Sequence, residues 1–333
     1  MKLFAPACRG GCGGALRRLG SAWSFAYGAP SRHTGSPFVT RSAVISSSLS
    51  AILASVARGA ARCALVSLGL MAMARAVPAL AQGSLDARYE ATLAGIPVGK
   101  GVWRIDIGDD QYSASAGGGS SGLLKAFAGG DGTGASQGRV LNGQLQPTNY
   151  NATTSTSRKS ESIRMTLAGG TIKEFAIVPE PPVDADRIPV TDAHRRGVFD
   201  PMTGSLLRVA GGGDPLAAES CRTTTSIFDG RMRYDLRFDF KRMDTVKAEK
   251  GYRGPALVCA IYFSPISGYI ADRAAIKYLV AQRDMEVWLV PIAGTRILVP
   301  FRLKIPTPLG NAVLEATQFI TAATPPRAAS KTQ

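Results

Sequence analysis

The feature that most constrains the fold is an eleven-residue run in which apolar and charged side chains alternate strictly. A β-strand has a side-chain period of two, so this run predicts a strand with one apolar face that is buried (the dry face) and one charged face that is exposed to solvent (the wet face). Each large apolar side chain contributes about 1.5–3 kcal/mol when it is fully buried. The run is preceded by Asp229-Gly230, which predicts a two-residue hairpin turn with the β-branched segment 223–228 as partner strand. The five apolar residues are Met232, Tyr234, Leu236, Phe238 and Phe240.

Short segments of the same kind follow one another along most of the chain. We expect a mainly β fold: a single antiparallel sheet, strongly curved or partly closed like a barrel-shaped meander, with one or two short helices. Two glycine-rich runs, 117–119 and 129–134, are interpreted as breaks between strands, with a helical turn at 122–127 between them. The expected strands are 88–93, 98–107, 111–116, 135–141, 148–154, 161–167, 171–178, 223–228, 231–241, 256–263, 285–291, 296–305 and 311–320.

Proline and aspartate mark the middle of the chain. The Pro-rich segment 179–190 predicts an extended surface connection. Asp200 followed by Pro201 is a typical helix start, and we expect a helix over 202–209 that ends at Gly211.

The first 81 residues have the character of a targeting sequence. Arg58 and Arg62 precede an eleven-residue apolar run, 64–74, which is too short to span a bilayer as a mature helix. Ala79-Leu80-Ala81 then forms a cleavage site before Gln82. We therefore expect a signal peptide at 58–81, export to the periplasm and no membrane span in the mature protein. An uncleaved anchor is the alternative.

The remaining boundaries follow from composition. Residues 1–57 are rich in Gly, Ser, Ala and Arg, and we expect them to be a disordered leader or to precede a true translation start between 45 and 56. The mature portion, 82–322, is expected to be one β-rich domain, and 323–333 a disordered tail.

The net charge of +15 is not a nucleic-acid signal, because it is unevenly distributed. Residues 1–81 carry nine basic residues and no acidic one, whereas the rest of the chain carries 30 basic and 24 acidic residues. Such a mixed composition is typical of a solvated surface, so we expect no nucleic-acid partner.

The mature chain resembles the family of exported bacterial proteins known as domain of unknown function 3108, over about residues 86–320. The resemblance is carried by a Tyr-x-Ala-x-Leu-x-Gly-x-x-x-Gly start at 89–99 and by the block Cys-x6-Phe-Asp-Gly-Arg-x-Arg-Tyr-Asp-Leu at 221–236. It implies a β-rich envelope protein and supplies no reaction.

The two cysteines of the mature portion, Cys221 and Cys259, are a disulfide candidate in an exported protein. A reactive thiol is the alternative. A nucleophilic cysteine normally needs a nearby base, and His194 is the only histidine after residue 33.

The same scarcity argues against several classes of enzyme. His194 lies in a polar segment with no Gly-x-Ser-x-Gly sequence to pair with it, and a disulfide would leave no thiolates for zinc. We therefore expect no metal and no cofactor. Asp229, Asp235 and Asp239 could form an acid–base pair, but alternation with arginines favours cross-strand charge pairing.

Two functional hypotheses remain, and the scarcity of histidine and of catalytic motifs favours the one that involves no catalysis. The chain could be a binding, carrier or assembly module of the envelope for a lipid-like or glycan ligand, or a carboxylate-dependent hydrolase of such a molecule. The wet strand face offers a possible surface for an anionic ligand: Arg231, Arg233, Arg237 and Lys241.

Overall fold

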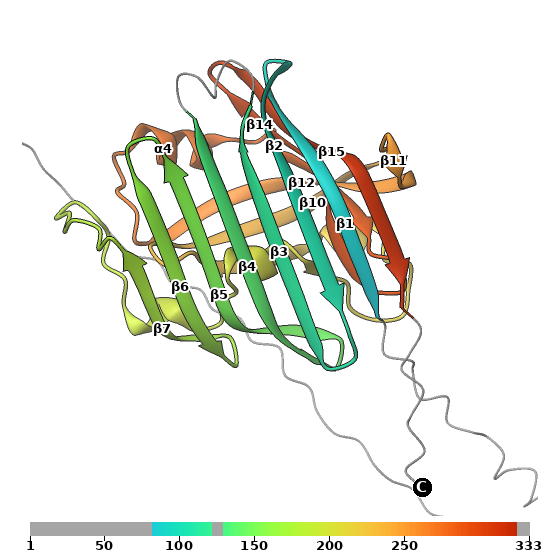
Figure 1. Cartoon of the computed structure of the whole chain (residues 1–333), viewed down its shortest axis with the longest axis horizontal. Coiled ribbons are helices and arrows are strands. Elements are labelled where there is room, and N and C mark those ends of the chain that lie inside the picture. Colours follow the sequence, from blue (N-terminus) through green and yellow to red (C-terminus); the bar gives the residue numbers. More distant parts are fainter. Residues whose placement is uncertain (1–81, 122–128, 325–333) are drawn as a thin grey trace, which may run out of the picture. The chain divides into compact units, whose positions relative to one another are not determined.

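The computed structural model describes residues 82–121 and 129–324, and these residues form one 15-stranded sheet with four short helical segments. The first seven strands are consecutive antiparallel neighbours, coloured from cyan to yellow-green in Figure 1. They are Gly83–Leu93 (β1), Ile96–Ile107 (β2), Gln111–Ser120 (β3), Gly130–Leu141 (β4), Gln144–Thr156 (β5), Ser160–Ala168 (β6) and Thr171–Val178 (β7).

The second half of the sheet begins at the other edge of β1. The strand order continues from β1 through β15, β14, β13, β12 and β10 to β9, so that β7 and β9 end the path and the sheet is not closed. The strands of this half are Leu207–Arg208 (β8), Thr223–Phe228 (β9), Arg233–Lys247 (β10), Lys250–Gly251 (β11), Arg253–Ser267 (β12), Glu286–Pro291 (β13), Ile297–Thr307 (β14) and Gly310–Ala323 (β15).

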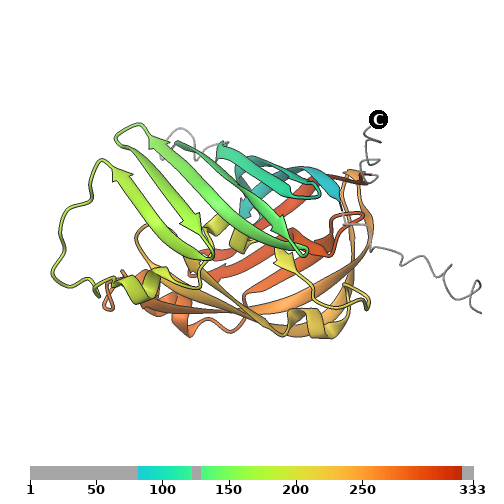
Figure 2. The same cartoon turned by 90° about the horizontal axis from the view of Figure 1, so that it is seen from below.

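The helical segments are all short. They comprise two 3-10 turns, Asp192–Arg195 (η1) and Ala218–Cys221 (η2), and two α-helices, Pro201–Gly204 (α3) and Ala274–Ala281 (α4). The prediction of a mainly β fold with a strongly curved or partly closed antiparallel sheet is therefore confirmed, and the sheet does not close. Figure 2 shows that the sheet curls so that strands of the first half lie opposite strands of the second half, with helical turns between the two layers.

One face of the sheet can be followed through the register of its strands, because directly paired antiparallel residues place their side chains on the same face. We call the face that carries Ala87 and Trp103 the inner face. Met202 of α3 lies against this face, since a Cβ added to Gly134 would be 3.4 Å from its Cε atom. Along one row of cross-strand partners, the inner face carries Gly99, Ala91, Leu314, Leu303, Val287, Cys259 and Phe240.

The strands β12, β13 and β14 are buried on both faces over part of their length. Residues 256–260, 286–290 and 297–299 form unbroken buried runs. A run of this kind does not alternate because each face is covered by another layer. At the tip of the β10–β12 hairpin, Tyr252 packs against Phe301 and Phe319, which belong to the largest buried apolar cluster.

The α-helix predicted over 202–209 is shorter than expected. Asp200 caps it and Pro201 opens it, as the sequence indicates, but α3 ends at Gly204. Leu207 and Arg208 instead form β8, which pairs with the start of β14. Pairing with a strand distant in the sequence therefore overrides the local helical pattern.

The hairpin predicted before β10 exists, but its turn differs. Phe228 pairs with Arg233, so the turn has four residues, and only Gly230 has a positive φ, of 96°. Asp229 explains the longer turn, because its carboxylate accepts hydrogen bonds from the backbone N–H groups of Arg231 and Met232 at 2.8 and 2.7 Å.

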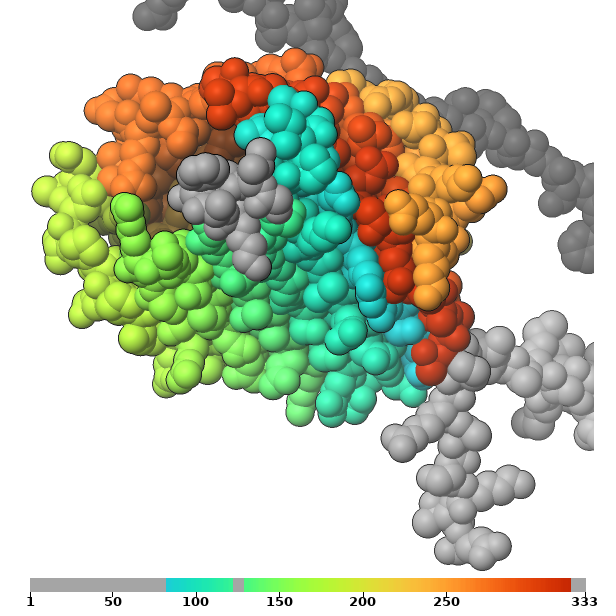
Figure 3. All heavy atoms as spheres, turned by 45° about the horizontal axis from the view of Figure 1, so that its top comes forward, coloured from blue at the N-terminus to red at the C-terminus, as the bar shows by residue number. Residues whose placement is uncertain are grey.

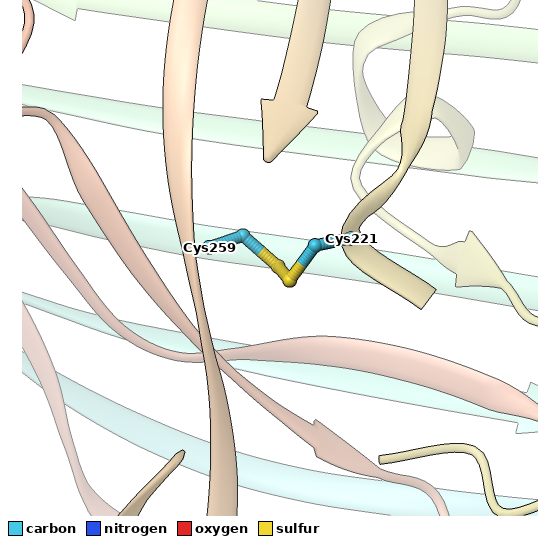
Figure 4. The surroundings of a disulfide bond; sticks show 2 residues. All are labelled: Cys221 and Cys259. Carbon is cyan, nitrogen blue, oxygen red and sulfur yellow. A yellow bond between two sulfur atoms is a disulfide. The ribbon is translucent and has the colours of Figure 1, made fainter. Parts of the chain in front are cut away.

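The disulfide between Cys221 and Cys259 is present, as predicted. It joins the end of η2 to the middle of β12 across a Cα–Cα distance of 5.6 Å (Figure 4). Both residues are fully buried. The bond therefore ties a segment that precedes the β9–β10 hairpin to the most deeply buried part of the sheet.

The leader expected at 1–57, the signal peptide expected at 58–81 and the helical turn expected at 122–127 lie outside the described residues. The expected tail does so from residue 325 onward, whereas Ala323 is the last residue of β15.

Replacing both bridged cysteines with alanine should lower the free energy of unfolding by about 4 kcal/mol, because the unfolded chain is released from a 38-residue loop. Urea unfolding of the variant and of the oxidised parent measures this difference. A loss below about 1 kcal/mol would contradict a structural role for the bond.

Candidate ligand-binding site

The two end strands of the sheet face each other across a seam. β7 and β9 do not pair with each other, and the segment between them bridges the gap at one end. Thr171 of β7 pairs with Arg196, and Phe199 forms a parallel bridge with Ile227 of β9. The seam is therefore closed by backbone hydrogen bonds at that end.

A pocket of about 650 Å³ lies beside the rest of the seam, and we call it the seam pocket. Its wall on the sheet side includes Phe175 and Ile177 of β7 and Phe228 of β9. The Pro-rich connection 180–190 forms the other wall, held in place by the hydrogen bonds of Ile188 with Tyr269 and Gly268. The extended connection predicted from sequence thus becomes the side of an apolar pocket.

The inner face is almost free of side chains across one end of β2, β3 and β4. Gly101 pairs with Gly118, and Gly118 pairs with Gly132. The expectation that the glycine-rich runs are breaks is wrong, since 117–119 lie within β3 and 130–134 within β4. Because glycines alternate along these strands, the inner face carries no side chains here, although the backbone pairs with the neighbouring strands throughout. We call these five inner-face residues the glycine strip: Gly99, Gly101, Gly118, Gly132 and Gly134.

Apolar side chains on the inner face of the second half remain only partly covered. Leu236 pairs with Phe263, and both are half-buried, as are Leu303 and Ile305 of β14. Of the five apolar residues expected on the dry face of β10, only Phe238 is buried, and Phe240 is 41% exposed. Figure 3 shows that the molecule is hollowed between the orange segment that includes α4 and the green strands.

Trp103 and Ala116 lie in one cross-strand row with Gly134 of the glycine strip, and Met202 lies against Gly134. Trp103 pairs with Ala87 on one side and Ala116 on the other, and only 9% of its surface is exposed. Its indole Nε1–H is buried and has no hydrogen-bond acceptor within the described part of the chain. Leaving such a donor without a partner costs about 1–3 kcal/mol.

Asp200 holds α3 against the inner face through a buried polar network. Its Oδ1 atom accepts hydrogen bonds from the backbone N–H groups of Met202 and Thr203 at 3.0 Å. Its Oδ2 atom accepts from the hydroxyls of Thr203 at 2.6 Å and Ser136 at 3.0 Å. Burial raises the pKa of Asp200, and these hydrogen bonds oppose that rise. The sequence indicates the helix cap but gives no sign that this carboxylate is fully buried.

Each residue of the predicted basic face has an acidic partner. Arg231 pairs with Glu161 across the seam, Arg233 with Asp235, Arg237 with Asp239, and Lys241 with Glu286. Arg237 also lies over the ring of Tyr262, with 4.1 Å between the guanidinium carbon and the ring centroid. The structure therefore places Arg233, Arg237 and Lys241 on β10 and Arg231 in the turn before it, and each of the four cations pairs with a carboxylate of the protein.

Glu286 is the most buried of these acids, with 4% of its side chain exposed. In addition to Lys241, it contacts Arg242 at 3.1 Å and Lys304 at 3.3 Å. Burial alone would raise its pKa, but hydrogen bonds from Arg242 and Lys241 and the charge of Lys304 outweigh that effect. They lower the pKa of Glu286 to about 2.

The other candidate catalytic residues are spread over the surface. His194 lies in η1 and contacts Thr191. Asp235 accepts a hydrogen bond from Ser226 at 2.8 Å in addition to its pairing with Arg233. Among residues 82–121 and 129–324, no group of three or more His, Cys, Asp or Glu side chains is arranged to hold a metal ion. Within the same ranges, no helix has both the length and the apolar character that a bilayer crossing requires.

A family model described as "Protein of unknown function (DUF3108)" matches residues 88–317. Among solved structures, the chain is similar to one described as "Crystal Structure of Beta-barrel-like Protein of Domain of Unknown Function DUF1849 from Brucella abortus". That similarity has a TM-score of 0.42 at 9% sequence identity, and it covers 73% of this chain and 98% of the other. A search of curated proteins found no match.

Because its folded pKa lies below its ordinary value, Glu286 should stabilise the fold above about pH 4.5, and this contribution should disappear as the pH falls to about 2. Glu286→Gln should therefore be less stable than the parent at pH 5 and equally stable near pH 2. Urea unfolding across this range measures the difference. The control is Glu315→Gln, which removes only a partly exposed pair with Arg302 and should cost under about 1 kcal/mol at any pH. An equal loss for Glu286→Gln at pH 5 and pH 2 would contradict the assignment.

Proposed function

We propose that this chain, which belongs to the DUF3108 family, is an exported protein of the bacterial periplasm that binds a lipid-like ligand without transforming it. The observation that carries the proposal is the form of the inner face. At one end of the sheet it carries bare glycines on one wall and half-buried apolar side chains on the other. Proteins normally cover such side chains with a layer of their own, so apolar surface that stays open inside a fold favours a ligand.

Export is supported by the sequence before the sheet and by the bond within it. The apolar run 64–74 and the small residues at 79–81 match a signal peptide. A buried disulfide is typical of proteins that fold in an oxidising compartment such as the periplasm.

A lipid is favoured over a glycan because of the character of the available surfaces. Glycans bind through hydrogen bonds, whereas the glycine strip and the facing residues Leu236, Phe263 and Leu303 offer little besides apolar contact. An anionic glycan would need the predicted basic face, and the cations of that face are already paired with carboxylates.

The hydrolase alternative is supported by one feature, the buried Asp200 beside Ser136, with 3.0 Å between the bonded oxygens. A hydrolytic acid must reach its substrate and exchange protons with it. Asp200 has no exposed surface, and both its oxygens are engaged in holding α3. The geometry therefore supports a structural role for this carboxylate.

Native mass spectrometry of the protein as purified from the periplasm of its own host should show a mass added by bound lipid. Extraction with organic solvent should remove that mass, and incubation of the refolded protein with host lipids should restore it. A protein that carries no lipid after purification and takes none up would contradict the proposed function.

A further inference from the structure

We propose that the seam pocket binds an extended, basic segment of a partner protein, which pairs as an added strand with the free edge of β7. This site is separate from the hollow on the inner face and does not depend on the proposed lipid ligand.

The edge of β7 that faces the seam is open along most of its length. β7 ends the strand path of the sheet, and on this edge only Thr171 is bridged, to Arg196, within the described part of the chain. Among the residues that the structure describes, the backbone of 173–178 makes no backbone hydrogen bond outside its pairing with β6. Such an edge presents N–H and C=O groups in the spacing that another extended chain needs to pair with it.

The Pro-rich connection 179–190 runs beside this edge but is poorly suited to pair with it. Four of its residues have no backbone N–H to donate: Pro179, Pro181, Pro182 and Pro189. The connection bonds instead to the chain that follows β12, where the backbone N–H of Ile188 donates to Tyr269. Figure 2 shows the connection curving away from β7 before it returns to η1. The edge therefore stays free although a segment of the same chain lies next to it.

The seam pocket, about 650 Å³ in volume, lies between β7 and the connection. Phe175, Ala176 and Ile177 all line it, and consecutive residues of a strand point to opposite faces. The pocket therefore borders the strand edge itself and not one face of the sheet alone. Phe175 and Ile188 are each 37% exposed, and the ring of Phe175 packs edge-on against Phe228. An added strand would lie about 4.8 Å from β7 and would bring alternate side chains against these apolar groups.

The charges of the pocket favour a basic partner. Four charged residues line it, and both cations are engaged: Arg231 pairs with Glu161, and Arg187 donates to a backbone carbonyl oxygen of the loop after β12. Neither Glu180 nor Asp184 forms an ion pair with any residue that the structure describes. Lysine or arginine side chains of a partner would complement these two carboxylates. An apolar lipid would leave both carboxylates and the strand edge without partners.

A second copy of this chain fits the edge less well. The β7 strand of that copy carries the same connection beside its own free edge, so both connections would have to move before the two edges could pair. Pairing would also bring the carboxylates of Glu180 and Asp184 from both copies together, and like charges at an interface oppose association.

Fluorescence anisotropy of a labelled peptide tests the site. A peptide of seven alternating lysine and valine residues, blocked at both ends, should bind the protein as purified from its host, at low salt. The same peptide with glutamate in place of lysine should bind at least about tenfold more weakly, because of Glu180 and Asp184. Equal binding of the two peptides would overturn the inference.

N-methylation of the peptide tests the strand pairing. Alternate N–H groups of an added strand face the neighbouring strand, and the others face away from it. Methylation of one alternate set of peptide nitrogens should therefore weaken binding at least about tenfold, whereas methylation of the other set should change it by less than about threefold. The second peptide controls for the added methyl groups. Equal losses for the two sets would contradict pairing with β7.

Charge reversal in the protein locates the peptide. Glu180→Lys combined with Asp184→Lys should weaken binding of the lysine peptide about tenfold and strengthen binding of the glutamate peptide. The matched control is Glu219→Lys combined with Glu249→Lys, which makes the same change in net charge at two exposed residues outside the pocket. A circular-dichroism spectrum and a melting curve like those of the parent show that both variants are folded. Unchanged peptide binding by the folded pocket variant would overturn the inference.

Two further outcomes would identify other occupants. If methyl stearate displaces the lysine peptide and the two charged peptides bind equally, the pocket takes a lipid. If the parent protein sediments as a dimer that the peptide dissociates, the edge belongs to a second copy. The inference fails in either case. The mass of bound lipid should be the same in the pocket variant and in the parent, so failure of this inference is distinguished from failure of the proposed function.

Discussion

The structure is governed by one constraint: a single curled sheet must bury the apolar side chains of its inner face although it does not close into a barrel. A closed barrel removes its edges by pairing the first strand with the last. Here β7 and β9 stay apart, and the connection between them, with Phe199 and Arg196 as its bridging residues, completes the wall at one end. The sheet, the connection between β7 and β9, and α3 therefore enclose the same interior. The space that one of them occupies is no longer open to side chains of the other two.

That interior is closed at one end and open at the other. Asp200 accepts three hydrogen bonds from α3 and a fourth from Ser136 of β4, and α3 contacts β3, β4 and β5. Large apolar side chains pack tightly below it. Above it, the glycine strip removes side chains from one wall while Leu236 and Phe263 remain half-buried on the other. The same chain thus builds a dense core and an apolar hollow within one sheet. The disulfide and the Glu286 cluster hold the second half in place around them.

Local patterns in the sequence predict the strands well but do not predict what covers them. The alternation over 231–241 identifies β10, and the Asp200–Pro201 pair identifies the start of α3, because both signals act within a few residues. The extent of α3 depends on β14, which is distant in the sequence and pairs with Leu207 and Arg208. β9 begins at Thr223, opposite Phe238, and therefore does not reach Phe240. The glycine runs mislead for the same reason. A glycine in isolation indicates a turn, whereas Gly118 and Gly132 are strand residues because both neighbouring strands pair with them.

The most direct measurement is a crystal structure of the protein isolated with its natural lipid from the periplasm. The account predicts continuous density on the inner face, between the glycine strip and the half-buried side chains of Leu236 and Phe263. A structure in which these side chains meet the glycines directly, leaving no space between the two walls, would contradict it.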